Sequence, residues 1–534
     1  MSRAWANAAF RGTVGLVHPD THFVGDREGP LRGVAYRRLR VHGDFVNPGH
    51  RFFPEPVGES SHFGVHIYGP LREIGFDHLS WLFSAEALRL SSRHDGSGDS
   101  PGIRYQGFLD ERPHLKRIVR VDLNVLILWQ RLTGDAGSMA DEARLLSPVS
   151  VDEQDGIKAL ADYSIRLGGF NPQISRGYEE SGAKNIGLID YDLSSPGDWS
   201  EIILKGIQLG VATPMFKSPT AGSNDVLGWN LVTMPADAMP DTEYRRVADI
   251  STYLAAQDLW IDHQSDGVQR RYTEFYRLAW RRQIAPDTER SLYAAIIPPG
   301  PAHVDLVHTL LMEDYRVTAL VAGFWASLPL DYFVRITGKG DLRIGSAKTL
   351  PFGLIRHPLA QALLLRTMRL NCLTNAYSDL WAEVYDEAWR NDEWVCTWDG
   401  LAPLADVGSA WEYGTPLRSE RSRRAALVEI DALVAVWLGM DVDALIAMYN
   451  ARFPVLNRFE ESMWFDAKGY KLAGNHRTIG QIQKKGQYEE MVAFNESGGT
   501  TKVPDGYTPP FYKADRIAEY RQAHAAFSER LARA

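Results

Sequence analysis

Residues 13–19, TVGLVHP, open the part of the sequence that decides the predicted fold. This short apolar run has the character of a strand, and it ends at Pro19 because proline stops regular structure. Residues 31–40, LRGVAYRRLR, then place apolar side chains near helical spacing, and residues 63–68, FGVHIY, return to strand character. Strands that alternate with a helix predict an α/β region over residues 1–150.

The two later regions have different patterns. Over residues 151–355, turn signals such as Asn171-Pro172 and Pro298-Pro299-Gly300 separate short apolar runs, which predicts a mixed α+β domain. Over residues 356–534 the apolar spacing becomes helical, because apolar side chains recur three and four apart. We therefore expect three domains, the last of them helical.

The composition is that of an ordinary folded protein. Of the 534 residues, 45% are hydrophobic and 23% are charged, which excludes a mainly disordered or fibrous chain. Two cysteines, Cys372 and Cys396, are too few for a disulfide framework, and no apolar run has the ~18 residues that a membrane span needs. We therefore expect a cytoplasmic protein. The formal net charge of -9 does not decide DNA binding, since a local basic groove can coexist with an acidic total.

Several stretches, in the same order along the chain, resemble the large adenine-specific DNA methyltransferases of type IIG restriction and DISARM-like phage-defence systems. They are GTVGLVHPD at 12–20, FGVHIY at 63–68, RSLYAAIIPPG at 290–300, LPLDYFVR at 328–335 and RAALVEID at 424–431. The resemblance implies a partial class I methyltransferase sheet, Rossmann-like, over residues 1–150. It also implies a target-recognition domain that binds double-stranded DNA over residues 151–355, and a helical C-terminal region over 356–534.

Two motifs of that family are missing from this chain. The family carries an Asn/Asp-Pro-Pro-Tyr/Phe loop that holds the flipped adenine, and a glycine-rich turn that holds S-adenosylmethionine. The one similar sequence, Thr508-Pro509-Pro510-Phe511, begins with Thr, which lacks the amide carbonyl, and is interpreted as a proline turn. The catalytic residues therefore stay unassigned. Through the resemblance, His18 and Pro19 are the candidate cofactor contacts.

Two interpretations follow from the missing motifs. The chain is the downstream part of a methyltransferase, either a split enzyme or a truncated gene product, whose N-terminal partner would supply S-adenosylmethionine binding and catalysis. Alternatively, it is a non-catalytic subunit that reads DNA sequence for a restriction or defence complex.

Other kinds of site have weaker patterns. His18 and His22 flank Asp20, and His62 and His66 share one face of a strand, but neither pair has further partners at a diagnostic spacing. We interpret them as satisfied loop or core histidines and expect no metal. A nuclease would need clustered carboxylates with a Lys, and Asp20 with Glu28 does not provide that spacing.

Arginines and aromatic residues interleave over residues 267–290. Taken alone, this pattern favours a helix with a solvated basic face, but its position in the resembled recognition region favours DNA contact, because guanidinium forks pair with phosphate oxygens. The candidate DNA-binding residues are Arg270, Arg271, Arg277, Arg281, Arg282, Arg290, Lys339 and Arg343.

Overall fold

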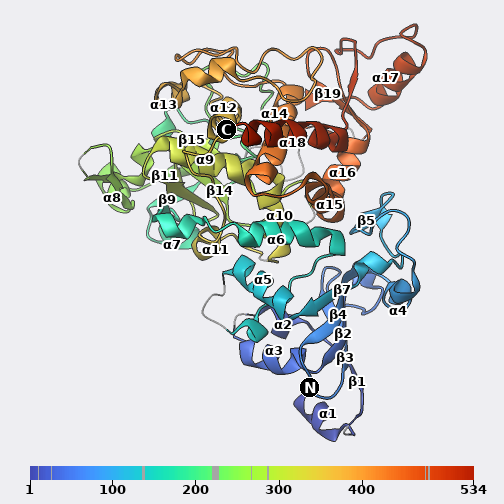
Figure 1. Cartoon of the computed structure of the whole chain (residues 1–534). Helices are drawn as coiled ribbons and strands as arrows, with labels where there is room; N and C mark the ends of the chain where they lie inside the picture. The colour runs from blue at the N-terminus through green and yellow to red at the C-terminus, as the bar shows by residue number, and fades with distance from the viewer. Residues whose placement is uncertain are drawn as a thin grey trace. The chain divides into compact units, whose positions relative to one another are not determined.

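The chain folds into two compact units in the computed structural model (Figure 1). The structure describes every residue except 10, 26, 135–138, 219–227, 266, 286–287, 339, 475–476 and 479–480. Unit 1 comprises residues 1–164, 332–338 and 438–457. Unit 2 comprises residues 165–331, 339–437 and 458–534. The first unit therefore extends somewhat beyond the expected bound at residue 150, and the two later expected domains fall largely within one unit.

Unit 1 is built on a five-stranded sheet with the order β1-β3-β2-β4-β7. Only the β2–β4 pair is parallel, and the other pairs are antiparallel. The mixture of strands and helices agrees with the α/β expectation, but a Rossmann-like sheet is not confirmed. The strands are β1 (Val14–His18), β2 (Leu39–Val46), β3 (His62–Tyr68), β4 (Gly75–Leu82) and β7 (Val119–Asp122), with a small hairpin of β5 (Arg104–Tyr105) and β6 (Phe108–Leu109).

Among the helices of unit 1, α5 begins and ends at residues that cap it. In α5, the Asp122 carboxylate accepts a hydrogen bond from the Val125 amide at the N-terminus, and Gly134 ends the helix with a φ of 74°, a left-handed conformation that favours glycine. The helices are α1 (Ser2–Asn7), α2 (Thr21–Val24), α3 (Gly29–Tyr36), α4 (Ala85–Leu90), α5 (Leu123–Thr133), α6 (Gln154–Asp162) and α15 (Val442–Arg452). The strand, helix and strand expected over residues 13–68 are thus present as β1, α3 and β3.

Unit 2 contains a four-stranded antiparallel sheet with the order β15-β14-β17-β8. Its strands are β8 (Gln173–Ser175), β14 (Arg277–Arg281), β15 (Ala294–Ile297) and β17 (Val307–Leu311). The shorter strands are β9 (Ile189–Ser194), β10 (Ile203–Leu204), β11 (Thr242–Arg246), β12 (Leu259–Asp262), β13 (Val268–Arg271), β16 (Ala302–His303), β18 (Met463–Phe465), β19 (Lys471–Ala473), β20 (Arg477–Thr478), β21 (Gln481–Ile482) and β22 (Tyr512–Lys513).

Helices contribute much of the rest of unit 2, and after residue 356, where helical spacing was expected, they alternate with five short strands in the described part of the chain. Among them, α14 and α18 lie side by side (Figure 1). The helices are α7 (Glu180–Asn185), α8 (Ile250–Ala255), α9 (Tyr315–Ala326), α11 (Ile344–Ala347), α12 (Ala360–Asn371), α13 (Ser378–Val384), α14 (Glu420–Trp437), α17 (Gln487–Glu496) and α18 (Arg516–Ala532). Two more, α10 (Leu328–Ile336) and α16 (Pro454–Glu461), carry residues of both units.

No single helix in the described part of the chain is long and apolar enough to cross a membrane. Helices α9 and α10 reach that length and composition only as a pair, and the pair is bent by 67°. From Val317 to Ala326 every residue of α9 is buried within the protein.

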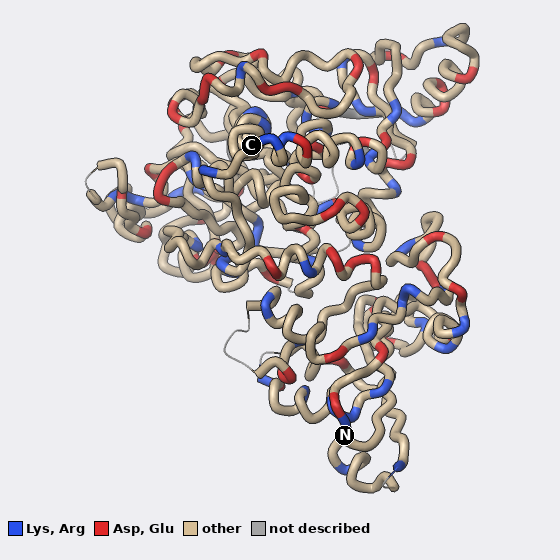
Figure 2. Tube along the Cα trace, in the orientation of Figure 1, with Lys and Arg blue, Asp and Glu red and all other residues tan. Residues whose placement is uncertain are grey.

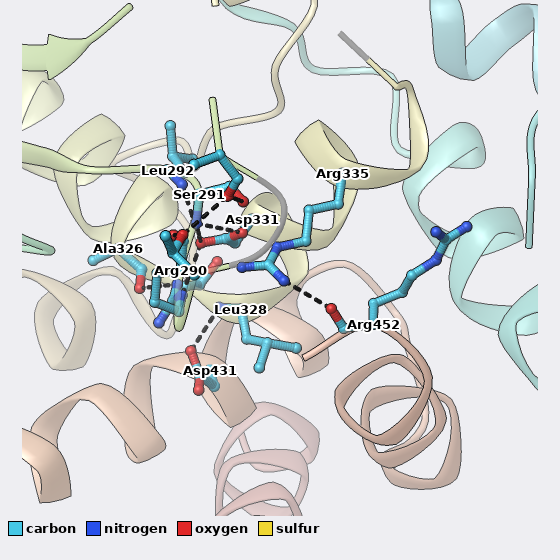
Figure 3. Close-up of polar contacts among 12 residues, drawn as sticks. Arg290, Ser291, Leu292, Ala326, Leu328, Asp331, Arg335, Asp431 and Arg452 are labelled. Carbon is cyan, nitrogen blue, oxygen red and sulfur yellow. Dashed lines mark hydrogen bonds and ion pairs between the residues drawn. The ribbon is translucent and has the colours of Figure 1, made fainter. Parts of the chain in front are cut away.

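Buried carboxylates connect elements of unit 2 through an ion pair and hydrogen bonds to backbone amides. Asp331 on α10 accepts hydrogen bonds from Arg290 Nε at 2.9 Å and from the amides of Ser291 and Leu292 (Figure 3). On α14, Asp431 accepts from the Leu328 amide at 2.6 Å. These carboxylates hold residues 290–292 and the start of α10 in place. An apolar residue in place of either Asp331 or Asp431 would leave backbone amides without acceptors.

Candidate nucleic-acid interface

A cavity of about 750 Å³ opens in unit 2. Its walls come from the loop after β9, from β11 and α8, from β13 with the following turn, and from the loop before β16. Four arginines and two glutamates line it, so its walls carry an excess of positive charge. This volume lies within the usual range for small-ligand sites, roughly 300–1,000 Å³. The charged lining residues are Glu201, Arg245, Arg246, Arg270, Arg271 and Glu274.

Arg270 and Arg271, two of the predicted DNA-binding residues, lie together at the end of β13. Each side chain is 40% exposed. Arg270 donates from Nη1 to Asp262 at 3.0 Å and from Nε to Glu274 at 3.2 Å, while Arg271 donates from Nε to the Leu254 carbonyl at 3.3 Å. Burial raises the pKa of Glu274, but hydrogen bonds from Arg270 and from the Arg271 amide outweigh it, so the net pKa is lowered. The two guanidinium groups are therefore held in place beside the cavity by an ionised carboxylate.

Arg245 and Arg246 at the end of β11 form the other basic wall, and the sequence argument did not select them. Both are exposed. Arg245 lies 3.7 Å from Asp192, with a side chain that is 62% exposed, and Arg246 donates to the Ala248 carbonyl at 3.2 Å. The adjacent arginines were visible in the sequence, but they lie outside residues 267–290, and only the fold brings β11 and β13 to the same cavity.

Buried polar groups next to the cavity are joined by a series of hydrogen bonds. Thr273 donates to Gln257 Oε1 at 2.7 Å, Gln257 Nε2 donates to the Tyr178 hydroxyl at 3.1 Å, and that hydroxyl donates to the Tyr253 carbonyl at 3.1 Å. Burial raises the pKa of Tyr253 well above its usual value, so this ring stays neutral. The residues that line the cavity thus include uncharged, hydrogen-bonded side chains and more arginines than glutamates, a combination that suits a ligand bearing phosphate groups.

Three other predicted residues lie inside the protein. Arg277 on β14 is fully buried and donates from Nη2 to the Pro301 carbonyl at 2.7 Å, and burial lowers its pKa to about 10. Arg281 donates to the Leu209 carbonyl, and Arg290 is paired with Asp331 (Figure 3). Residues 268–281 form a strand, a short turn and a second strand instead of one helix, because β13 pairs with β12 and β14 pairs with β15 and β17.

The remaining predicted residues are distributed differently. Arg282 pairs with Asp305 at 2.7 Å and Arg343 with Asp341 at 3.1 Å, and the Arg343 side chain is 71% exposed. Lys339 lies outside the described residues. Figure 2 shows Lys and Arg interspersed with Asp and Glu along the trace, without one long basic stripe.

The candidate cofactor contacts lie in unit 1. His18 ends β1 and stacks on the ring of His66 with 3.9 Å between centroids, and Pro19 is exposed. Contact of either residue with S-adenosylmethionine stays a prediction.

Comparison with known proteins gives neighbours among solved structures and no assigned family. No known protein family and no curated protein matches the chain. Among solved structures, the type IIG restriction endonuclease BpuSI aligns with 13% identity and a TM-score of 0.29. The alignment covers 84% of this chain and 48% of the BpuSI chain, so the chain spans about half the length of that enzyme. At this TM-score the alignment does not establish a shared fold or function.

Proposed function

We propose that this protein recognises DNA as part of a restriction-modification or phage-defence system, and that unit 2 makes the contact. The observation that carries the proposal is the cavity walled by Arg245, Arg246, Arg270 and Arg271. Guanidinium groups on two sides of one hollow can pair with phosphate oxygens of the DNA backbone, which is the commonest source of affinity for nucleic acid.

Phosphate contacts position a protein on DNA but do not read its sequence. The proposed cavity therefore accounts for affinity and register, while base-reading side chains remain unassigned. Of the residues selected from the sequence, Arg270, Arg271 and Arg343 are the ones we retain as DNA contacts. Arg277, Arg281 and Arg290 are left out because their guanidinium groups are bound by groups inside the protein.

The sequence resemblance supports a role in adenine methylation. We propose that a partner polypeptide supplies the glycine-rich turn and the Asn-Pro-Pro-Tyr loop, so that methyl transfer from S-adenosylmethionine to the adenine amine requires both chains. The second candidate function is a DNA reader without catalysis. Adding a polypeptide that bears both motifs, with labelled S-adenosylmethionine and duplex DNA, distinguishes them: the split enzyme methylates DNA, and the reader does not.

The Arg245→Ala/Arg246→Ala variant should bind duplex DNA more weakly. Two lost phosphate contacts would reduce the slope of log K against log salt by about 2, because each contact contributes roughly 0.9 on B-form DNA. The measurement is a salt series of fluorescence-anisotropy titrations with random-sequence duplexes.

A matched control removes the same charge elsewhere in unit 2. Arg390 and Arg533 are exposed arginines, each paired with one nearby glutamate. Arg390→Ala/Arg533→Ala should leave the salt slope unchanged. An equal loss in both double variants would show a general charge effect and would overturn the assignment of the cavity.

A further inference from the structure

Four histidines lie in a row on unit 1. In the sheet, His42 on β2 pairs in register with His66 on β3 and with His78 on β4. The ring of His42 stacks on those of His66 and His78, with centroids 4.9 and 4.8 Å apart. At the end of β1, His18 stacks on the other side of His66 at 3.9 Å. Neighbouring strands thus align imidazoles that lie far apart in the sequence.

Asp20 lies beside this row and contacts two of its rings. Its Oδ2 lies 3.2 Å from His42 Nε2, and its Oδ1 lies 3.2 Å from His66 Nε2. The ligating atoms of His18, Asp20 and His66 all lie within 4.8 Å of one another. A tetrahedral zinc ion with ligand bonds of about 2.0 Å holds its ligand atoms about 3.3 Å apart. The Asp20–His66 separation therefore matches one edge of such a site.

Several atoms of this cluster are buried without any hydrogen-bond partner. They are His18 Nε2, His22 Nε2, Asp20 Oδ1 and both ring nitrogens of His66. Although Asp20 Oδ1 and His66 Nε2 are close, they do not have hydrogen-bond geometry. An unsatisfied buried polar atom costs about 1–3 kcal/mol, so the interpretation of these residues as satisfied core histidines does not account for them. A bound cation would satisfy His18 Nε2, His22 Nε2, Asp20 Oδ1 and one ring nitrogen of His66 together.

A second set of groups orients the carboxylate. His78 Nε2 lies 3.0 Å from the Leu146 carbonyl, so it donates there, and its Nδ1 accepts from His42 Nδ1 at 2.7 Å. His42 Nε2 lies 3.2 Å from Asp20 Oδ2, and His42 donates to both His78 and Asp20 only in the form that carries a proton on each ring nitrogen. Hydrogen-bonded chains of this kind fix the direction of a metal-binding carboxylate or imidazole in known metal sites.

Close packing explains why a glycine lies opposite the cluster. A Cβ atom at Gly64 would lie 2.1 Å from Asp20 Oδ1 and 2.3 Å from His66 Nε2. Any larger residue at position 64 would therefore displace the two groups whose separation matches the tetrahedral edge.

We propose that unit 1 binds one transition-metal dication, with zinc as the best fit, through His18, Asp20 and His66, with His22 as the fourth ligand. Three imidazoles and one carboxylate, without thiolate, form a ligand set that zinc accepts in tetrahedral geometry. The ring of His22 lies 5.0 Å from that of His18, so closure on the ion requires a small movement of the short helix α2.

Cobalt(II) titration of the full-length chain, first stripped with a chelator, tests this proposal. We expect one equivalent of Co²⁺ to give the visible absorption of a tetrahedral site, and one equivalent of Zn²⁺ to remove it. No thiolate charge-transfer band should appear, because both cysteines are buried in unit 2. A chain that shows no saturable absorption, or one with a thiolate band, would overturn the proposal.

Variants locate the site. His18→Gln, at a partly exposed position, should abolish the absorption while circular dichroism stays unchanged. His42→Gln, which removes the ring that contacts Asp20 and stacks on His66 but keeps every proposed ligand, should weaken Co²⁺ binding about 10–100-fold. Gly64→Ala should also weaken it while leaving every ligand present.

His62→Gln is the matched control, since His62 lies on the same strand as His66 but pairs with Asp44 at 2.8 Å. It should bind Co²⁺ like the unaltered chain, and equal loss in His18→Gln and His62→Gln would contradict the assigned ligands. No DNA is present in these titrations, so their outcome is independent of the proposed DNA interface.

Discussion

Asp331→Asn should destabilise unit 2 by about 3–5 kcal/mol, because it leaves the buried guanidinium of Arg290 without its charged partner. Asp331 is fully buried, and Arg290 is only 7% exposed. The same carboxylate also accepts the amides of Ser291 and Leu292 (Figure 3), so its loss loosens the connection between β14 and β15 as well. Urea denaturation of the full chain, followed by tryptophan fluorescence, measures the change.

Two comparisons separate charge from packing in that experiment. Asp192→Asn removes a carboxylate from an exposed pair with Arg245 in the same unit, and it should cost no more than about 1 kcal/mol. The double variant Arg290→Met/Asp331→Asn should recover part of the loss, because it removes the unpaired charge while the introduced carboxamide oxygen still accepts a backbone amide. If the double variant is less stable than Asp331→Asn, the ion pair is not the source of the effect.

Acidification should reveal a second large contribution, from Glu460 on α16. Burial alone would raise the pKa of this carboxyl, but Arg424 and Arg516 outweigh it and lower the pKa to about 2. Arg424 Nε lies 3.0 Å from Glu460 Oε1, and Arg516 Nη2 lies 2.8 Å from the same oxygen. The pair of guanidinium groups therefore stabilises the ionised carboxylate in the folded state.

The direction of the pH effect follows from this lowered pKa. A group whose pKa is lower in the folded state stabilises the fold above its unfolded pKa, here about 4.5, and that contribution disappears as the pH falls towards 2. The shift corresponds to about 3 kcal/mol. We therefore expect the contribution of Glu460 to the free energy of unfolding to fall by about 3 kcal/mol as the pH falls from about 4.5 towards 2. Other carboxylates will add their own contributions to the total change.

Glu460→Gln isolates the contribution of this one residue. Its free energy of unfolding should be lower at neutral pH, since two buried arginines lose a charged partner, and its dependence on pH between about 4.5 and 2 should be flatter. Glu387→Gln, which alters an exposed pair with Arg390, should keep the original pH dependence. Parallel pH curves for Glu460→Gln and the unaltered chain would contradict the assignment.

Some features of the fold could be predicted from local sequence because local interactions produce them. The apolar run before Pro19 is β1, the helical spacing after Leu31 is α3, and FGVHIY lies within β3. Within residues 356–534, where the apolar spacing is helical, α14 is the longest helix in the described part of the chain. Side-chain periodicity and turn residues act within a few positions of each other, so they can be read without knowing the rest of the fold.

The surroundings of individual charged residues could not be predicted in this way. Arg277 and Arg270 look alike in the sequence, yet one is buried against carbonyls and the other lines a cavity. Arg245 joins Arg270 there although 25 positions separate them in the numbering. Burial depends on which elements pack against a strand, and that is decided by contacts between distant segments.

The histidine cluster shows the same division most clearly. The sequence by itself determined that His18 ends a strand near Asp20 and that His66 lies on another strand. Only the tertiary structure, through the strand order β1-β3-β2-β4, brings His18, Asp20 and His66 together. It also places Gly64 where any side chain would collide with Asp20 and His66. Strand order and register are set by the burial of whole faces of the sheet, a cooperative property that no short stretch of sequence contains.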